Sequence, residues 1–263
     1  MPGLAPTRRL ARLPPIQAAA TRGGRLTYIR SGHGQPTLLL FNGAGMTLQG
    51  WEPLYPAIER LGTVLAWNRF GVQGSDAPRE RQTGHAVLAA LRQLLVQAGV
   101  QPPYVLVAHS LGALHAQLFA RLHAQEVAGV AFIEGNHPDD EAVLKKHEPQ
   151  LVRALGKVLA LPQALFRRNV HSELACVEET VREIAAAGRF PPVPLRVVTG
   201  GVTPQSWRMS PGAVGAKRAH QQELARLSPR GVQVIAQESG HFPQLTQPAL
   251  VMEVLRELVA QVR

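Results

Sequence analysis

The sequence predicts an α/β fold in which a mostly parallel central sheet is flanked by helices on both faces. Apolar runs of strand length alternate with longer amphipathic stretches along most of the 263 residues. This alternation implies right-handed crossover connections between parallel strands. Two of the runs, Thr37 to Phe41 and Tyr104 to Ala108, are almost wholly apolar, as expected for strands buried on both faces. We therefore expect a single α/β domain over residues 1–263.

The first part of the chain predicts a hairpin, two buried strands and two helices. Gly23 and Gly24 join two short extended segments, which is typical of a hairpin. The second helix is expected because apolar residues recur on one side of it before Pro102 and Pro103 stop the chain. The expected elements are strands Ile16 to Ala20, Leu26 to Arg30 and Thr37 to Phe41, helix Trp51 to Leu61, strand Val64 to Trp67 and helix Gly84 to Ala98.

The remaining elements continue the same alternation. They are strand Tyr104 to Ala108, helix Leu111 to Leu122, strand Gly129 to Ile133, strand Leu195 to Thr199, helix Ala213 to Leu227, strand Val232 to Ala236 and helix Ala249 to Val262. One interval, residues 137–190, contains no strand-like run, only amphipathic stretches such as Leu151 to Leu159 and Val177 to Ala187. We expect it to be a helical lid insertion over the carboxyl edge of the sheet, where ligands bind in such folds.

Composition and charge argue against several classes of protein. Apolar residues make up 45% of the chain and charged residues 17%, as in packed globular proteins. The net charge of +10 comes from scattered Lys and Arg without an aromatic-interleaved basic stripe, which favours a solvated surface over a nucleic-acid site. No apolar run is long enough to span a membrane, and the single cysteine, Cys176, cannot form an internal disulfide. We expect a cytoplasmic protein with a small-molecule substrate and neither a nucleic-acid nor a membrane partner.

A candidate nucleophile lies between a predicted strand and a predicted helix, in Ala108-His109-Ser110-Leu111-Gly112. A tight strand-to-helix turn exposes the serine and requires small residues two positions away on either side. Ala108 stands where a glycine is usual, and it is still small. The alternative is that Ser110 only caps the helix.

Two other turns supply the parts that an activated serine needs. Asn42-Gly43-Ala44-Gly45 follows an earlier strand, and its glycines let the backbone approach a reacting oxyanion. The amides of Ala44 and Leu111 are therefore the candidate oxyanion hole. Ser239-Gly240-His241 follows the last strand, where His241 is a candidate general base or, alternatively, a surface histidine.

These motifs, in this order, resemble the α/β-hydrolase superfamily, particularly its small lid-bearing esterase-like and lactonase-like members. The resemblance runs from about Ile16 onward and includes the loop Asn68-Arg69-Phe70-Gly71-Val72-Gln73-Gly74-Ser75-Asp76. Two positions depart from the usual pattern: relatives have His-Gly at Asn42-Gly43 and an aspartate at Asn68. The resemblance implies hydrolysis through an acyl-enzyme. Dehalogenases and epoxide hydrolases of this fold use an aspartate as nucleophile, so a serine at position 110 argues against both activities.

The third member of a catalytic triad is less obvious. Many relatives carry the acid after the penultimate strand, but no carboxylate occurs from Ile184 through Gln222. Glu134 follows the preceding strand, where some family members place their acid, and it preserves the order serine, acid, histidine. Glu134 could instead cap the lid or pair with an arginine, and Asp139 and Asp140 are expected to cap a helix.

The other conspicuous side chains have simpler interpretations. We expect His109, His115 and His137 to be structural and Trp51, Trp67 and Trp207 to fill the core. No group of residues has metal-ligand spacing, and neither a phosphate loop nor a dinucleotide fingerprint is present. We therefore expect no cofactor and no metal.

The predicted function is serine-dependent hydrolysis of a small ester, lactone or related carbonyl compound. The fold alone does not dictate this. The alternatives are a lyase, a cofactor-free oxygenase or a small-molecule-binding protein with weak hydrolysis.

Overall fold

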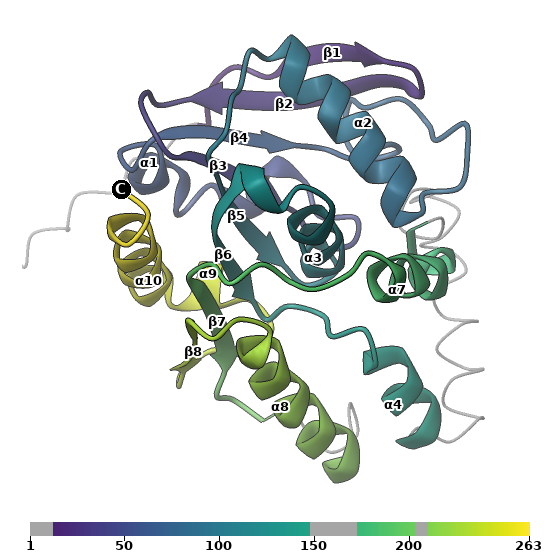
Figure 1. Ribbon diagram of the computed structural model, residues 1–263, viewed down its shortest axis with the longest axis vertical. Helices are drawn as coiled ribbons and strands as arrows, with labels where there is room; N and C mark the ends of the chain where they lie inside the picture. The colour runs from purple at the N-terminus through teal and green to yellow at the C-terminus, as the bar shows by residue number, and fades with distance from the viewer. Residues whose placement is uncertain (1–12, 148–172, 204–209) are drawn as a thin grey trace, which may run out of the picture.

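One eight-stranded sheet runs through the part of the chain that the structure describes, in the order β1-β2-β4-β3-β5-β6-β7-β8 (Figure 1). This computed structural model describes residues 13–147, 173–203 and 210–263. The strands from β4 to β8 in this order pair in parallel, and the β1-β2 hairpin joins them antiparallel. The bounds are β1 (Gln17–Thr21), β2 (Gly24–Ser31), β3 (Thr37–Phe41), β4 (Thr63–Trp67), β5 (Tyr104–His109), β6 (Val127–Ile133), β7 (Leu195–Gly200) and β8 (Gly231–Ala236).

Helices cover both faces of this sheet (Figure 1). Helices α2, α3, α7 and α8 contribute to one hydrophobic cluster, and η1, α1 and α10 contribute to the other. The helices are η1 (Leu48–Trp51), α1 (Tyr55–Ile58), α2 (Gly84–Gln97), α3 (Gly112–Leu122), η2 (Ala124–Glu126), α4 (Asp140–His147), α7 (Val177–Ala186), α8 (Pro211–Arg226), α9 (Pro243–Thr246) and α10 (Pro248–Ala260). The predicted α/β fold with a mostly parallel sheet is confirmed.

The continuously apolar strands are explained by their place between the two clusters. In β3, Leu39 and Phe41 belong to one cluster, whereas Leu38 and Leu40 belong to the other. Successive side chains of a strand point to opposite faces, so a strand with helices on both faces needs apolar residues at every position. All five residues of β3 are buried.

The helix expected over Trp51 to Leu61 is wrong in extent. The structure has η1 ending at Trp51 and only the four residues of α1 beyond it. Pro53 lies between the two elements, and Pro56 lies in the first turn of α1. Proline disfavours helical backbone in the residue before it and lacks the amide that a longer helix would use.

The predicted lid, residues 137–190, lies only partly within the described residues. Near the start of this interval, helix α4 packs against α8. Near the end of the interval, helix α7 packs against α2 and α3. The stretch expected as a helix at Leu151 to Leu159 lies outside the described residues, as does Trp207. The lid therefore stays a prediction.

Residues that the sequence places in the core are buried. Trp51 and Trp67 are fully buried, as predicted, and so are His115 and the thiol of Cys176. None of the helices within the described ranges is long and apolar enough to cross a membrane.

Candidate active site

Ser110 lies in the turn between β5 and α3, with a backbone φ of 51°. Few non-glycine residues adopt this left-handed region, and such strain is common where a side chain must be presented at a site. The turn is tight because a Cβ on Gly112 would lie 2.5 Å from the carbonyl oxygen of Phe41. Ala108 is completely buried at the other flank, so its methyl group fits where a glycine is usual.

The structure brings Ser110, His241 and Glu134 into one hydrogen-bonded chain. Nε2 of His241 lies 3.0 Å from Oγ of Ser110, and Nδ1 lies 3.3 Å from Oε2 of Glu134. Oγ of Ser110 also lies 3.4 Å from Oδ1 of Asn136. Ser110 follows β5, Glu134 follows β6 and His241 comes after β8. The carboxyl ends of these parallel strands lie at one edge of the sheet.

Glu134 is buried and both of its oxygens are engaged. Oε1 accepts the amide of Gly200 at 2.7 Å, and Oε2 also lies 3.0 Å from Nζ of Lys217. Burial alone would raise the pKa of Glu134, but the hydrogen bond from His241, the charge of Lys217 and the Gly200 amide together lower it to about 2. Glu134 is therefore ionised at neutral pH, and its cationic partner is a lysine rather than an arginine.

The amide of Leu111 lies in the serine turn, and that of Ala44 lies in the loop after β3. Within the described residues neither donates a hydrogen bond to the protein, which leaves both free to bind an oxyanion. The approach of the two loops depends on Gly43, since a Cβ there would lie 2.8 Å from Nδ1 of His109 and 3.3 Å from Cβ of Ser110.

A buried ion pair between Arg69 and Glu173 holds the Ala44 loop. Both side chains are almost inaccessible to solvent, with exposures of 2% and 0%. The guanidinium also donates to the carbonyls of Asn42 and Gly43, at 2.8 and 2.7 Å. Sequence reasoning missed this pair: Arg69 lies within the loop that carried the family resemblance, but nothing in the sequence links it to Glu173.

The second oxygen of Glu173 also supports the loop, and Asn42 bonds within it where relatives have a histidine. Oε2 of Glu173 accepts the amide of Gly45 at 3.2 Å. The side chain of Asn42 donates to the carbonyls of Trp67 and Met46 and accepts the indole N–H of Trp51. The side-chain amide of Asn42 therefore holds the loop at the end next to β3, and Glu173 holds it further along, at Gly45.

His109, in the variable position of the turn, packs against His241 and Phe242, in line with the structural role expected for it. Its Nε2 lies 2.8 Å from the backbone oxygen of His241 and donates to it, and its ring lies 5.2 Å from the ring of Phe242. Burial, and next the neighbouring charge of His241, lowers the pKa of His109 to about 4. It is neutral at physiological pH, and its ring N–H holds the backbone of His241.

A small pocket of about 70 Å³ opens beside the chain of Ser110, His241 and Glu134, between the end of β7 and α8. Glu134 and His241 line it, together with Lys217 and Arg218. The loop of residues 200–203 that forms another wall is the segment in which many relatives carry their acid. Ser110 is not among the described residues that line it.

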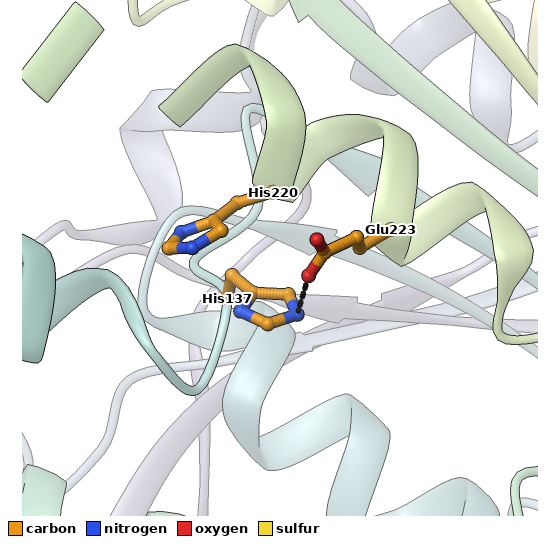
Figure 2. Close-up of side chains that lie close together, drawn as sticks. All are labelled: His137, His220 and Glu223. Atoms are coloured by element: carbon orange, nitrogen blue, oxygen red, sulfur yellow. Dashed lines mark ion pairs between the residues drawn. The ribbon is translucent and has the colours of Figure 1, made fainter. Parts of the chain in front are cut away.

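Three titratable side chains gather outside these contacts: His137, His220 and Glu223 (Figure 2). One candidate ligand atom from each lies within 4.8 Å of the others. The amide of Asp139 donates to Nδ1 of His137 at 3.1 Å, which leaves the proton of the neutral ring on Nε2, 3.5 Å from Glu223. A metal needs an unprotonated nitrogen with a free lone pair, and His137 offers none in this arrangement.

The second histidine of this group is also engaged. Nδ1 of His220 lies 2.7 Å from Oδ1 of Asp140, and the other oxygen of Asp140 accepts the amide of His137 at 2.8 Å. These four side chains thus tie the start of α4 to α8. Asp140 is the first residue of α4, and its carboxylate binds His220 and the amide of His137 rather than an amide of the helix, so the expected capping is not seen there.

The match to known families follows from these motifs. The family model described as the alpha/beta hydrolase fold matches residues 36–172, just over half of the chain. The chain belongs to the α/β-hydrolase family. This α/β hydrolase is 29% identical over 108 residues to the uncharacterized protein YqjL of Bacillus subtilis (strain 168). The aligned region covers 41% of this chain and 43% of the relative. The chain spans about half the length of the first curated relatives that it matches.

Solved structures give the same fold at low sequence identity. A haloalkane dehalogenase from Bradyrhizobium elkani superposes on this α/β hydrolase with a TM-score of 0.72 at 17% identity, over 94% of this chain and 98% of that one. An enol-lactonase from Burkholderia xenovorans superposes with a TM-score of 0.63 at 18% identity, over 93% and 100% of the two chains. The predicted α/β-hydrolase resemblance is confirmed at the level of family and fold.

Proposed function

We propose that the protein is a serine hydrolase that acts on a small ester, lactone or related carbonyl compound. The observation that carries the proposal is the continuous chain from Oγ of Ser110 through His241 to Glu134, with distances of 3.0 and 3.3 Å. A serine hydroxyl is unreactive without a base to accept its proton, and a base in this position is held by a buried carboxylate.

The reaction follows from these contacts. His241 takes the proton from Oγ of Ser110 as the oxygen attacks the carbonyl carbon, and Glu134 stabilises the imidazolium that forms. The amides of Ala44 and Leu111 bind the resulting oxyanion. The intermediate collapses to an acyl-enzyme as the imidazolium protonates the leaving alkoxide, and water, deprotonated by His241, then releases the acid.

The choice of carbonyl substrate rests on the nucleophile and on a neighbour of the same fold. Dehalogenases of this fold use an aspartate where this chain has Ser110, so the likeness to the haloalkane dehalogenase does not extend to its chemistry. The enol-lactonase supports a lactone or ester as the substrate class. Without a reactive Ser110, the alternative is a small-molecule-binding protein of the same fold.

Labelling with a fluorophosphonate tests the proposal before a substrate is known. We expect the wild type to be labelled and to hydrolyse p-nitrophenyl acetate, and Ser110→Ala to do neither while it unfolds at the same temperature. Ser31→Ala is the matched control. Ser31 is the last residue of β2, far along the chain from the site, and its hydroxyl bonds only Tyr55 and Glu59 among the described residues. Equal labelling of the wild type and Ser110→Ala would reject the nucleophile, and an unlabelled wild type would reject the function.

A further inference from the structure

Lys217 contacts the same carboxylate oxygen as the candidate base. Its Nζ lies 3.0 Å from Oε2 of Glu134, and that oxygen is 3.3 Å from Nδ1 of His241. The lysine reaches the site from α8, an element that supplies none of the three residues Ser110, His241 and Glu134. Its side chain is 29% exposed, whereas that of Glu134 is 7% exposed, so the pair is screened only partly by solvent.

A cation at this oxygen opposes the task of the acid. In a serine triad the carboxylate stabilises the imidazolium that forms when the base takes the proton. An ammonium group on the same oxygen neutralises part of that negative charge and repels the positive imidazolium. The amide of Gly200, which binds the other oxygen, carries no net charge and has no comparable effect.

We propose that Lys217 is a positioning residue that sets the pH range of this site, by holding Glu134 and weakening the support that its carboxylate gives to protonated His241. The inference rests on the proposed function. Its consequence is that His241 stays neutral, and able to accept the proton of Ser110, at a lower pH than it would beside an unpaired carboxylate.

The other groups around His241 do not produce this effect. His109 faces the ring at 5.0 Å between centroids, and its pKa of about 4 keeps it neutral above pH 5. Phe242 packs on the imidazole from the same loop and carries no charge. Arg218, the next residue of α8, lines the same pocket but donates to Oγ1 of Thr203 rather than to Glu134. Among the described residues that face the base, Glu134 and Lys217 are therefore the charged pair.

The test removes the ammonium and keeps the length of the side chain. We expect Lys217→Met to move the acidic limb of the kcat/KM profile for p-nitrophenyl acetate to higher pH by about 1 unit, the lower end of the shifts that neighbouring charges produce. Lys217→Arg should keep the wild-type limb, because it restores the cation. Arg218→Met is the matched control and should move the limb much less, since it removes a charge from the same pocket that does not touch Glu134.

A second readout does not depend on catalysis. The Cε1 proton resonance of His241, assigned with His241→Gln, should titrate with the same shift to higher pH in Lys217→Met. Lys217→Gln provides a second neutral variant if Lys217→Met does not fold. An unchanged titration midpoint in a folded neutral variant would overturn the inference. If the midpoint moves but Ser110 is not labelled in the wild type, the electrostatic coupling holds and the proposed hydrolysis fails.

Discussion

Glu134 reaches His241 from the end of β6, with Oε2 3.3 Å from Nδ1 of the imidazole. Its backbone φ of 47° turns the chain out of the strand at that point. The neighbouring strand β7 ends at Gly200, whose amide binds the carboxylate instead of supplying one. In the proposed triad, the carboxylate thus comes from one strand earlier than in many relatives, because the ends of adjacent parallel strands lie side by side.

We expect Glu134→Gln to lower turnover by at least roughly 10²-fold, since loss of an orienting acid in a triad costs up to about 10⁴-fold. The amide would remain uncharged and could hold the imidazole in the wrong tautomer. The measurement is the rate of p-nitrophenyl acetate hydrolysis by the purified, folded variants.

Asp139→Asn and Asp140→Asn are the controls for this prediction and should stay within about 10-fold of the wild type, the scale of a lost cap or surface charge. Asp140 bonds His220, and Asp139 contacts His137, away from the serine. A collapse of either aspartate variant beside an active Glu134→Gln would show that the acid is misassigned. Full activity of all three would indicate a serine-histidine dyad.

His109 makes the folded protein sensitive to acid. Its pKa falls from about 6.5 in an unfolded chain to about 4 in the folded one, so the unfolded state binds more protons between these values. Stability therefore rises with pH across this window and is lost as pH falls through it. We expect the free energy of unfolding to decrease by about 3 kcal/mol more in the wild type than in His109→Gln between pH 7 and pH 4.

Urea unfolding at several pH values measures this difference. Glutamine keeps a donor for the carbonyl of His241 and does not titrate, so the comparison isolates the ionisation of His109. Parallel pH dependences of the two proteins would mean that His109 does not carry this proton linkage.

The buried pair of Arg69 and Glu173 should matter to both stability and rate. Glu173→Gln leaves the guanidinium without a counterion, and we expect the free energy of unfolding to fall by about 3–5 kcal/mol. The same variant releases the Ala44 loop and should lower turnover of the remaining folded protein by at least about 10-fold, because a displaced oxyanion donor weakens binding of the transition state.

Glu179→Gln is the matched control, because it breaks an ion pair with Arg81 whose side chains are 63% and 33% exposed. Exposed pairs contribute little to stability. Chemical denaturation and the rate of fluorophosphonate labelling, measured on both variants, separate the two effects. Equal, small changes in both proteins would show that the pair does not hold the loop.

The sequence by itself indicated the fold and named Ser110, His241 and Glu134, which the structure brings into one hydrogen-bonded chain. Apolar runs such as β3 are local signals, since a strand buried on both faces must be apolar at each position. The turns around Ser110 and His241 are local too, because their glycines and small residues are dictated by backbone geometry within a few positions. The extent of the helix at Trp51 was misjudged, because Pro53 separates η1 from the short α1.

The tertiary structure alone decided which charges meet. Glu134 was the predicted acid, but its alternative roles stayed open until the structure placed its carboxylate beside His241. Lys217 and Glu173 gave no signal at all, because an ion pair depends on distance in space and is indifferent to separation along the chain: 104 residues separate Arg69 from Glu173. Local backbone rules therefore predict where a nucleophile is presented, whereas its electrostatic surroundings are set by long-range packing that a single sequence does not encode in any local pattern.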